Sequence, residues 1–387
     1  MRIIAITSRF PFPLDKGDKL RAYHQLFQLS KENEIHLIAI SDKKVEDYQI
    51  EQVKTFCKSV YVFKLKKWKI AINLFIGLFS NKPFQVKYFY QRSIHKKVKA
   101  LIQTIQPDHI YCQLIRCVSY VQDEHQYKKT LDYMDAFSKG MERRIKNAGI
   151  KKPLFKIEAF RLIRFENLAF EFFDNHCIIS DQDRSLIFHE KKQKIHVITN
   201  GIDSDYFYPE NRTKKYDLVF VGNLSYAPNV DAANYIAKEL LPSLKSSKPN
   251  IKILICGANP TQQIINLKNE NITIKGWTKD IRDAYLSSKI FIAPMRIGTG
   301  LQNKLLEAMS LELPCVTSEL VNKALLAKSN KELLIAKNKQ DYINYIIQLI
   351  DDEQLRASIG LQARKYITEN FNWESSSNQL YNIMRST

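Results

Sequence analysis

Short runs of apolar and β-branched residues alternate along the chain with longer stretches in which apolar residues recur every three or four positions. The runs are typical of buried strands, and the longer stretches are typical of amphipathic helices. Strands that alternate with helices form parallel sheets. The expected strands are 2–7, 34–40, 59–63, 109–113, 129–134, 176–180, 194–199, 217–222, 251–257, 289–294 and 314–318.

These strands predict two α/β domains rather than one. Eleven strands are too many for one short doubly wound sheet, and a turn-rich connector at 198–217 is followed by a fresh series of strands and helices. We therefore expect an N-terminal domain at 1–195 and a C-terminal domain that starts at 196. An eight-stranded α/β barrel is the competing architecture, and the irregular connector counts against it.

Composition and charge narrow the class of protein. The 387 residues are 45% hydrophobic and 26% charged, which is usual for a globular enzyme. Lys and Arg exceed Asp and Glu by 59 to 40, and this net charge of +19 favours anionic partners such as nucleic acid, anionic lipid or phosphorylated small molecules. Six scattered cysteines, with no CxxC pair, predict buried thiols in a reducing cytosol.

Neither export nor membrane insertion is predicted. The apolar stretch near the start, 3–6, is far shorter than the core of a secretory signal. The most apolar run, 70–79, falls well short of the roughly 20 residues that span a bilayer. We expect a cytoplasmic protein.

The first candidate ligand loop is RFPFPLDKGDKLRAYH, in which Gly17 lies between a strand that ends at Thr7 and a helix that begins near Asp18. Ligands of open α/β sheets bind where loops leave the carboxyl ends of strands, and glycine there lets the backbone approach a ligand. The alternative is a plain turn in which Asp18 caps the helix. The sequence leaves both open.

The second candidate loop, in KIFIAPMRIGTGLQNKLLEAMS, is the stronger one. Gly298 and Gly300 precede a helix that starts near Leu301, and unpaired backbone N–H groups at such a helix end suit a diphosphate. Lys304 lies one turn into the helix, and Glu307 shares its face, where a carboxylate can accept two hydrogen bonds from a ribose diol. A surface Lys/Glu pair is the alternative.

At this point the chain resembles a known family. The segments GTGLQNKLLEAMSLELPCVTS, VITNGIDSDYFYP, DLVFVGNLSYAPNVDAANYI and SRFPFPLDKGDKLRAYH are similar to those of the retaining nucleotide-sugar glycosyltransferases of family 4. That family has the GT-B fold of two facing Rossmann-like domains. Within it, the opening and the 296–310 segment resemble the exopolysaccharide-associated "sugar transferase" group. The resemblance covers essentially the full chain.

The resemblance implies the domains and the donor site. The C-terminal donor domain would span 196–365, and a C-terminal helix at 366–387 would pack back on the N-terminal acceptor domain. Glu307 would bind the ribose, the loop at 298–302 would meet the phosphates or the sugar, and Asn200 with Gly201 would form the hinge. The donor-binding residues that it implies are Gly17, Gly222, Asn223, Trp277, Gly298, Thr299, Gly300, Leu301, Gln302, Lys304 and Glu307.

The implied catalytic residues are Asp135 and Lys304. Asp135 follows a strand of the N-terminal domain where many family members place a catalytic His or Asp near the transferred sugar. It could equally be the N-cap of the next helix. Asp132, earlier in the strand, is the second candidate for the carboxylate. Trp277 follows a strand and would contact the nucleotide ring, or it could belong to the core.

The chain departs from the family pattern at two places. Many members have Glu eight positions before the ribose-binding Glu, and this chain has Thr299 there. The segment 221–231 also lacks the cation that many members use to bind the diphosphate. Lys304 and backbone N–H groups would then neutralise the phosphates. No acidic pair at a strand end suits a metal, so we expect neither a metal nor another cofactor.

A cationic and aromatic segment at 64–99 is a third feature. Lys64, Lys66, Lys67 and Lys69 precede an apolar stretch with Trp68, the composition of a helix that lies in a membrane interface. A buried helix with a solvated lysine edge is the alternative. The segment predicts peripheral contact with the cytoplasmic face of a membrane.

The function that the resemblance implies is transfer of a sugar from a nucleoside diphosphate sugar to an acceptor hydroxyl, with retained configuration, in cell-surface polysaccharide or glycolipid synthesis. The acceptor would be a glycan or a lipid-linked molecule. A noncatalytic nucleotide-sugar-binding homologue or a same-fold epimerase is the alternative. A nicotinamide oxidoreductase is disfavoured because no GxGxxG follows a strand, and a nucleic-acid binder because the basic residues are dispersed.

Overall fold

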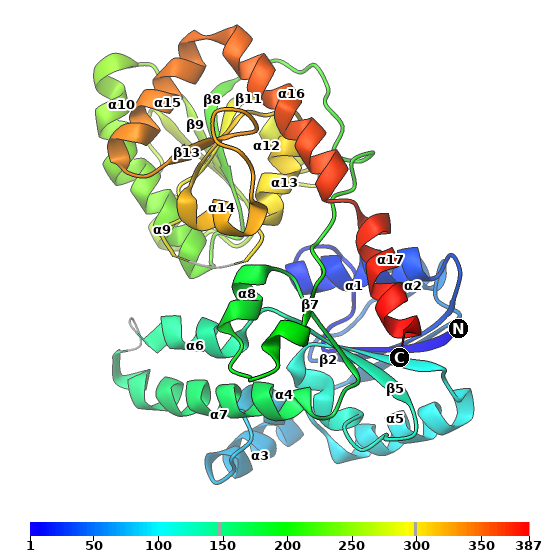
Figure 1. Cartoon of the computed structure of the whole chain (residues 1–387). Helices are drawn as coiled ribbons and strands as arrows, with labels where there is room; N and C mark the ends of the chain where they lie inside the picture. The colour runs from blue at the N-terminus through cyan, green and yellow to red at the C-terminus, as the bar shows by residue number, and fades with distance from the viewer. Residues whose placement is uncertain (146–148, 298–299, 387) are drawn as a thin grey trace. The chain divides into compact units, whose positions relative to one another are not determined.

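The computed structural model describes residues 1–145, 149–297 and 300–386, which form two compact units (Figure 1). Unit 1 contains Met1–Asn200 and Trp373–Thr387, and unit 2 contains Gly201–Asn372. The expected divisions at 195 and 365 therefore lie too early. A short strand at 196–197 completes the sheet of unit 1, and a helix with the buried residue Ile367 stays in unit 2 as far as Asn370.

Unit 1 is built on a parallel sheet with the strand order β3-β2-β1-β4-β5-β6-β7. The strands β1 and β2 are almost wholly buried runs rich in Ile, Leu and Ala, and β4 is fully buried, as expected for a sheet covered on both faces. The order reverses between β1 and β4. The strands are β1 (Arg2–Thr7), β2 (Glu34–Ser41), β3 (Ser59–Lys64), β4 (His109–Gln113), β5 (Lys128–Met134), β6 (Asn175–Ile178) and β7 (His196–Val197).

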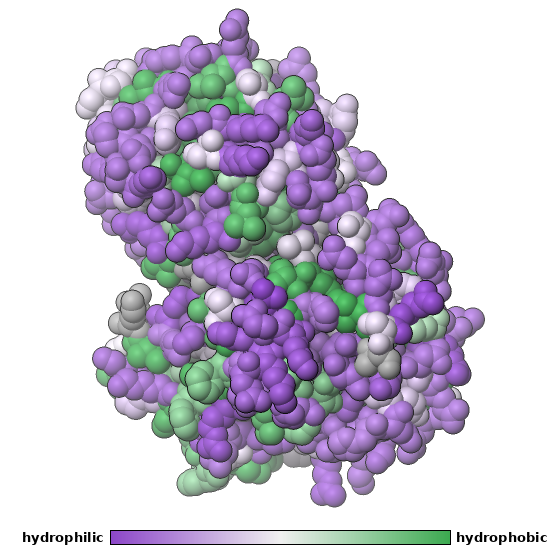
Figure 2. Space-filling model, in the orientation of Figure 1, coloured by the Kyte–Doolittle hydropathy of each residue, from purple (hydrophilic) through white to green (hydrophobic). Residues whose placement is uncertain are grey.

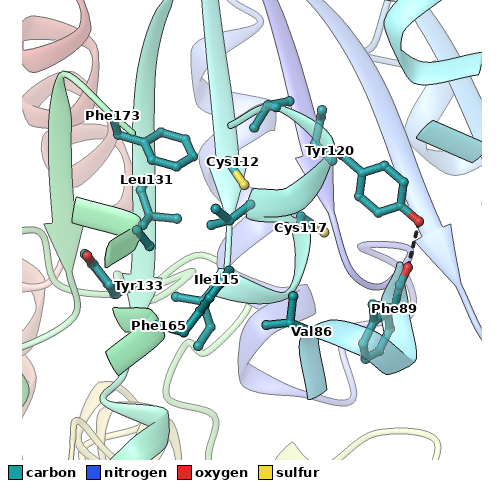
Figure 3. Packing of buried hydrophobic residues seen from close by; sticks show 14 of the residues in the cluster. Val86, Phe89, Cys112, Ile115, Cys117, Tyr120, Leu131, Tyr133, Phe165 and Phe173 are labelled. Carbon is teal, nitrogen blue, oxygen red and sulfur yellow. Dashed lines mark hydrogen bonds between the residues drawn. The ribbon is translucent and has the colours of Figure 1, made fainter. Parts of the chain in front are cut away.

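Helices cover the sheet of unit 1. Successive residues of β1 point to opposite faces, so Ile4 and Ile6 belong to one core cluster while Ile3 and Ala5 belong to another. Figure 3 shows part of the first cluster, where Tyr120 Oη donates to the backbone oxygen of Phe89 (2.7 Å). The helices are α1 (Gly17–Leu29), α2 (Asp47–Lys54), α3 (Lys67–Leu78), α4 (Phe84–Phe89), α5 (Arg92–Ile105), α6 (Phe137–Ile145), α7 (Lys152–Phe170), α8 (Asp181–Leu186) and α17 (Trp373–Arg385).

The helix α17 belongs to unit 1 although it follows unit 2 in the sequence. Leu380 and Met384 are buried in the second cluster, and α17 packs on α1, where Trp373 stacks on His24 with ring centroids 4.9 Å apart. The last residue before unit 2 is also anchored in unit 1, because Arg21 Nη1 donates to Asn200 Oδ1 (3.0 Å). Both ends of the chain therefore belong to unit 1, and unit 2 is inserted between them in the sequence.

Unit 2 repeats the same design, with the parallel order β10-β9-β8-β11-β12-β13. This order, too, reverses between its first strand, β8, and β11. Its strands are β8 (Tyr216–Val221), β9 (Ile253–Cys256), β10 (Ile272–Lys275), β11 (Ser288–Ala293), β12 (Cys315–Ser318) and β13 (Leu334–Ala336). Its helices are α9 (Ala227–Tyr235), α10 (Leu241–Ser247), α11 (Gln262–Ile265), α12 (Arg282–Leu286), α13 (Asn303–Ser310), α14 (Glu319–Leu325), α15 (Lys339–Asp351) and α16 (Glu353–Asn370).

Two parallel, doubly wound units confirm the expected α/β class of Rossmann-like domains. The six cysteines are free and buried, as the sequence predicted. Among the described residues, none of the helices combines the length and apolar character needed to cross a bilayer.

Candidate active site

Loops from β8 and β11 meet at the point where the strand order of unit 2 reverses, which is where open α/β sheets bind ligands. The β11 loop leads into α13, and Gly300 has φ of 80°, a left-handed conformation that favours glycine. Leu301 is buried, and Gln302 Nε2 turns back to the backbone oxygen of Gly300 (3.3 Å). Gly298 and Thr299 lie outside the described residues. The first turn of α13 carries the positive end of the helix dipole.

Lys304 connects the two loops. Its Nζ donates to Asn229 Oδ1 (2.5 Å) on α9, lies 3.7 Å from Met295 Sδ, and sits 4.7 Å from the ring centroid of Phe220. Burial lowers the pKa of Lys304 to about 7, while the nearby Glu307 opposes this shift. A lysine of this kind gains its charge when an anion binds beside it.

Asn229 is the residue that brings the loops together, and sequence reasoning gave it no role. It is buried, and its Nδ2 donates to the backbone oxygen of Asn223 (2.9 Å), just after β8. A Cβ at Gly222 would lie 2.7 Å from Asn229 Nδ2, so any side chain there would displace the asparagine. Gly222, Asn223 and Lys304, predicted as donor-binding residues, thus lie around one buried amide.

Glu307 lies one turn after Lys304, and one of its two carboxylate oxygens accepts a hydrogen bond. Tyr285 Oη donates to Glu307 Oε2 (2.7 Å), and Oε1 accepts no hydrogen bond from any residue that the structure describes. Burial raises the pKa of Glu307, against the opposing effects of the Tyr285 hydroxyl and Lys304. Tyr285, fully buried on α12, orients the carboxylate, and the sequence analysis did not identify it.

Trp277 follows β10 and is 71% exposed, so the alternative that it packs in the core is wrong. It lines a shallow hollow of about 530 Å³ in unit 2 together with Tyr206, Lys279 and Arg282. The Arg282 guanidinium lies 4.2 Å from the ring centroid of Tyr206. The hollow is also lined by Asp283 and by Asp280, which pairs with Arg282 (2.7 Å), so its charge is mixed, and the exposed indole offers a stacking surface for a planar ligand.

In unit 1, loops after the adjacent strands β1, β4 and β5 carry charged side chains. Gly17 begins α1, and the N-cap of this helix is Lys16 rather than Asp18. Asp18 lies in the first turn, is buried, and pairs with Arg9 (2.5 Å). The structure therefore rejects the capping role considered for Asp18.

The two carboxylates at the end of β5 have different surroundings. Asp132 is buried, and its Oδ2 accepts from Arg21 Nε (2.6 Å) and from Tyr111 Oη (2.7 Å). Its Oδ1 accepts from the backbone N–H of Met134 (2.9 Å), which has φ of 63°. Asp135, directly after this bend, is exposed. Asp132 shapes the bend, and Asp135 is available to a ligand.

The alternative that Asp135 caps a helix is not supported. The helix α6 begins at Phe137, which places its N-cap position at Ala136. The first turn is instead satisfied by Glu166 of α7, which accepts from Ser138 N (2.9 Å) and Ser138 Oγ (2.6 Å). Burial raises the pKa of Glu166 to about 7, against these hydrogen bonds.

Metal ions in proteins are held by clusters of His, Cys, Asp and Glu side chains. Within residues 1–145, 149–297 and 300–386, no group of three or more His, Cys, Asp or Glu side chains could hold a metal ion. The expectation of a reaction without metal or cofactor stays a prediction.

Two Rossmann-like units in one chain, with the fold of the solved glycosyltransferase structures that the chain resembles, define the GT-B class of fold. Residues 215–352 match the family model described as "Glycosyl transferases group 1". Unit 2 thus carries a glycosyl transferases group 1 domain, and this match supports a transferase of sugars.

The chain is similar to proteins from several bacteria. A 44.6 kDa protein in the cps region of Klebsiella pneumoniae is 23% identical over 394 residues, which cover 96% of each chain. The Escherichia coli UDP-Gal:alpha-D-GlcNAc-diphosphoundecaprenol alpha-1,3-galactosyltransferase is 29% identical over 205 residues, 46% of this chain and 51% of the relative. Sucrose-phosphate synthase from Thermosynechococcus elongatus has the same fold, with a TM-score of 0.71 at 14% identity over 100% of this chain and 99% of that one.

Proposed function

We propose that this protein transfers a sugar from a nucleoside diphosphate sugar to an acceptor hydroxyl with retention of the anomeric configuration. The contact between Lys304 and Asn229 carries this proposal, because it brings a half-buried lysine to the strand reversal of a group 1 domain. The family-4 resemblance of the sequence supports the retaining mechanism, and the relatives named above support sugar transfer.

In the proposed donor complex the diphosphate lies against the first turn of α13. The backbone N–H groups there and Lys304 Nζ donate to its oxygens, and Glu307 Oε1 accepts from the ribose diol. Because Tyr285 occupies Oε2, the carboxylate is already oriented before the nucleotide binds. Trp277 offers a stacking surface for a nucleotide ring.

The reaction breaks the bond between the anomeric carbon and the diphosphate oxygen, whose electron pair stays with the diphosphate. Lys304 and the N-terminus of α13 stabilise the negative charge that grows there. The acceptor oxygen forms the new bond on the same face of the sugar, and its proton passes to the departing diphosphate oxygen. Asp135 is the carboxylate that we assign to the positive charge developing at the anomeric carbon. The proposal includes no metal and no other cofactor.

The acceptor class is part of the proposal. The Escherichia coli relative is named for a diphosphoundecaprenol acceptor, and the Klebsiella relative lies in a cps region. We assign this chain to cell-surface polysaccharide or glycolipid synthesis at the cytoplasmic side of a membrane, with a glycan or lipid-linked acceptor.

A thermal-shift and calorimetric screen against UDP-, GDP-, ADP- and dTDP-sugars tests the donor site. One nucleotide series should raise the melting temperature of the wild type, and Glu307→Ala should lose this effect because the ribose contact is gone. Glu369→Ala, which removes an exposed carboxylate of the same unit, is the matched control and should respond as the wild type does.

The outcomes separate the candidate functions. If no nucleotide sugar stabilises the wild type, the transferase proposal is wrong. Binding without transfer or donor hydrolysis, across acceptor preparations, would indicate a noncatalytic homologue. A nucleotide sugar of altered configuration as the product would indicate an epimerase.

A further inference from the structure

The helix α3 exposes an apolar face that the fold leaves uncovered. Trp68, Ile72, Phe75, Ile76 and Phe79 are spaced so that they lie on one side of the helix and its C-cap. Phe75 is 65% exposed and Phe79 is 83% exposed. The opposite side packs on α4, so the apolar face is not needed for the core of unit 1.

The helix α7 continues this surface. Its buried side belongs to the first core cluster, yet Leu154, Ile157, Phe160 and Leu168 are exposed on the other side. A helix that is apolar on both sides is usually covered on both. The surface formed by the exposed apolar side chains of α3 and α7 is called the α3–α7 face below.

Specific contacts hold the two helices together. Arg161 of α7 donates from Nη1 to the backbone oxygen of Gly77 (2.7 Å) and from Nη2 to that of Leu78 (3.1 Å), which caps the C-terminus of α3. Glu158 accepts from the backbone N–H of Phe84 (2.7 Å), at the start of α4. The α3–α7 face is therefore a fixed surface. Figure 2 shows apolar side chains in the lower part of the molecule, where Figure 1 draws these helices.

The charges around this face are mostly positive, although Glu171 at the C-cap of α7 is an exposed carboxylate. The sequence has no Asp or Glu between Glu51 and Asp108, and twelve Lys and Arg in that interval. Lys64, Lys66 and Lys67 are exposed beside the N-terminus of α3. On α7, the exposed charged residues Lys152, Lys156 and Arg164 are basic, whereas the two carboxylates of that helix, Glu158 and Glu166, are buried.

We propose that the α3–α7 face docks on an anionic lipid surface, with the apolar side chains in the interface and the lysines against the headgroups. Exposed Trp and Phe flanked by Lys are the composition that binds membranes at the headgroup level. The sequence pattern predicted this contact over 64–99. The proposed contact surface consists of α3 and α7 and excludes the second half of that segment. The reason is that the apolar side of α5, which includes Val98 and Ile102, is buried.

A second copy of the chain is a poorer occupant. Two copies that met through this face would bring together mostly positive surfaces, with no exposed carboxylate within α3 or α7 to offset them. An anionic bilayer offers both the apolar layer and the opposite charge. The docking does not depend on the proposed sugar transfer, since it concerns a different part of unit 1.

Flotation with vesicles tests the docking. Wild-type protein should float with vesicles of phosphatidylglycerol and phosphatidylcholine and remain unbound with phosphatidylcholine alone. Phe75→Ser/Phe79→Ser and Ile157→Ser/Phe160→Ser should each lower the partition coefficient by about tenfold or more, because each removes two apolar side chains from the interface. The matched control is Ile265→Ser/Leu361→Ser, which removes two exposed apolar residues of unit 2 and should float as the wild type does.

Several results would overturn the proposal. These are equal flotation with both vesicle types, no flotation of the wild type, and an equal loss in the control. Sedimentation provides a further one: a dimer that dissociates in Phe75→Ser/Phe79→Ser would assign the face to a second copy.

Tryptophan fluorescence tests the docking without a substitution in the α3–α7 face. The three tryptophans are Trp68, Trp277 and Trp373, and Trp373 is buried. In Trp277→Phe, Trp68 is the exposed indole, so anionic vesicles should shift its emission to shorter wavelength and brominated lipid should quench it. Unchanged emission with bound vesicles would place the lipid contact elsewhere and contradict the proposal.

Discussion

The partners of Lys304 show what sequence spacing can and cannot predict for a single residue. The glycine loop and the helix start indicated an anion site with Lys304 and Glu307, and the structure places both on the expected helix. It also adds Asn229, which is 75 positions from Lys304, and Tyr285, which is 22 positions from Glu307. No local pattern identifies such residues, because only the folded sheet brings them together.

The carboxylates in and after β5 show the same limit. The sequence left Asp132, within the strand, and Asp135, directly after it, as alternatives for one role. The structure separates them through Arg21, which is 111 positions from Asp132 and buries its charge against it. An ion pair between distant residues in a core leaves no periodic signal in the sequence.

The lowered pKa of Lys304 predicts pH-dependent donor binding. Free Lys304 has a pKa of about 7, and a bound diphosphate would raise it, so binding takes up a proton above pH 7. The donor dissociation constant should be constant below about pH 6 and rise by up to about tenfold per pH unit above pH 7. Calorimetry at pH 8 in buffers of different ionisation enthalpy measures the proton uptake.

Lys304→Arg is the control for this titration, because arginine keeps its charge over the whole range. Its donor affinity should vary little between pH 6 and pH 9. The same pH profile in the variant and the wild type would show that another group titrates.

Replacing each carboxylate of β5 should have a different effect. Asp135→Asn should lower turnover by about 100-fold or more and leave donor affinity unchanged, because it removes a charge that acts in the transition state. Asp132→Asn should lower the free energy of unfolding of unit 1 by about 3–5 kcal/mol, because it leaves Arg21 buried without its counter-ion. Steady-state kinetics and urea denaturation measure the two effects.

Tryptophan fluorescence in a Trp277→Phe background reports the unfolding of unit 1, because Trp68 and Trp373 both belong to that unit.

An Asp135→Asn enzyme that turned over at the wild-type rate would show that Asp135 takes no part in the chemistry.

At the scale of elements, the hydrophobic pattern predicted most strands because they are buried on both faces. Two strands were absent from the expected set. β13 is apolar but has only three residues, and β10 lies at the sheet edge with Thr273 and Lys275 exposed, so it does not form a continuous apolar run. Helix ends were less predictable, because distant residues cap them. Asp18 and Asp135 were considered as caps, whereas α1 begins after Lys16 and α6 is capped by Glu166.

Removing this long-range cap should destabilise unit 1. Glu166→Ala leaves Ser138 N and Oγ without their buried acceptor, so the free energy of unfolding should fall by about 1–3 kcal/mol. Urea denaturation in the Trp277→Phe background measures it. Glu142→Ala, which removes a partly exposed partner of Lys139 on α6, should cost less than about 1 kcal/mol. Equal losses in the two variants would argue against the cap.

At the scale of the molecule, the sequence predicted two units but not the positions where the chain passes between them. Those positions depend on which sheet or core a residue joins. The strand β7 pairs in the sheet of unit 1, whereas Ile367 is buried in unit 2. The α3–α7 face was predicted only in part for a similar reason. The pattern of α7 is that of an amphipathic helix in a core, and only the structure shows that its second apolar side is uncovered.

Leu380→Ala tests the dependence of unit 1 on α17. Leu380 is fully buried in the second core cluster, so the substitution should cost unit 1 about 2–5 kcal/mol in free energy of unfolding. Fluorescence in the Trp277→Phe background follows the transition.

Leu349→Ala is the matched control, because Leu349 is equally buried but lies in α15 of unit 2. Leu349→Ala should not shift the unfolding transition of unit 1. A shift of the same size in both variants would show that the units unfold together, and the effect of Leu380→Ala would then say nothing specific about α17.

The position of α17 also has a consequence for synthesis on the ribosome. Unit 2 interrupts unit 1 in the sequence, so residues 201–372 are translated before α17, which contributes Leu380 and Met384 to the second core cluster. A nascent chain released before residue 373 holds a complete unit 2 beside a unit 1 whose core is open on one side. Unit 1 therefore closes after unit 2 has emerged, and prematurely terminated chains present an apolar surface to chaperones and proteases.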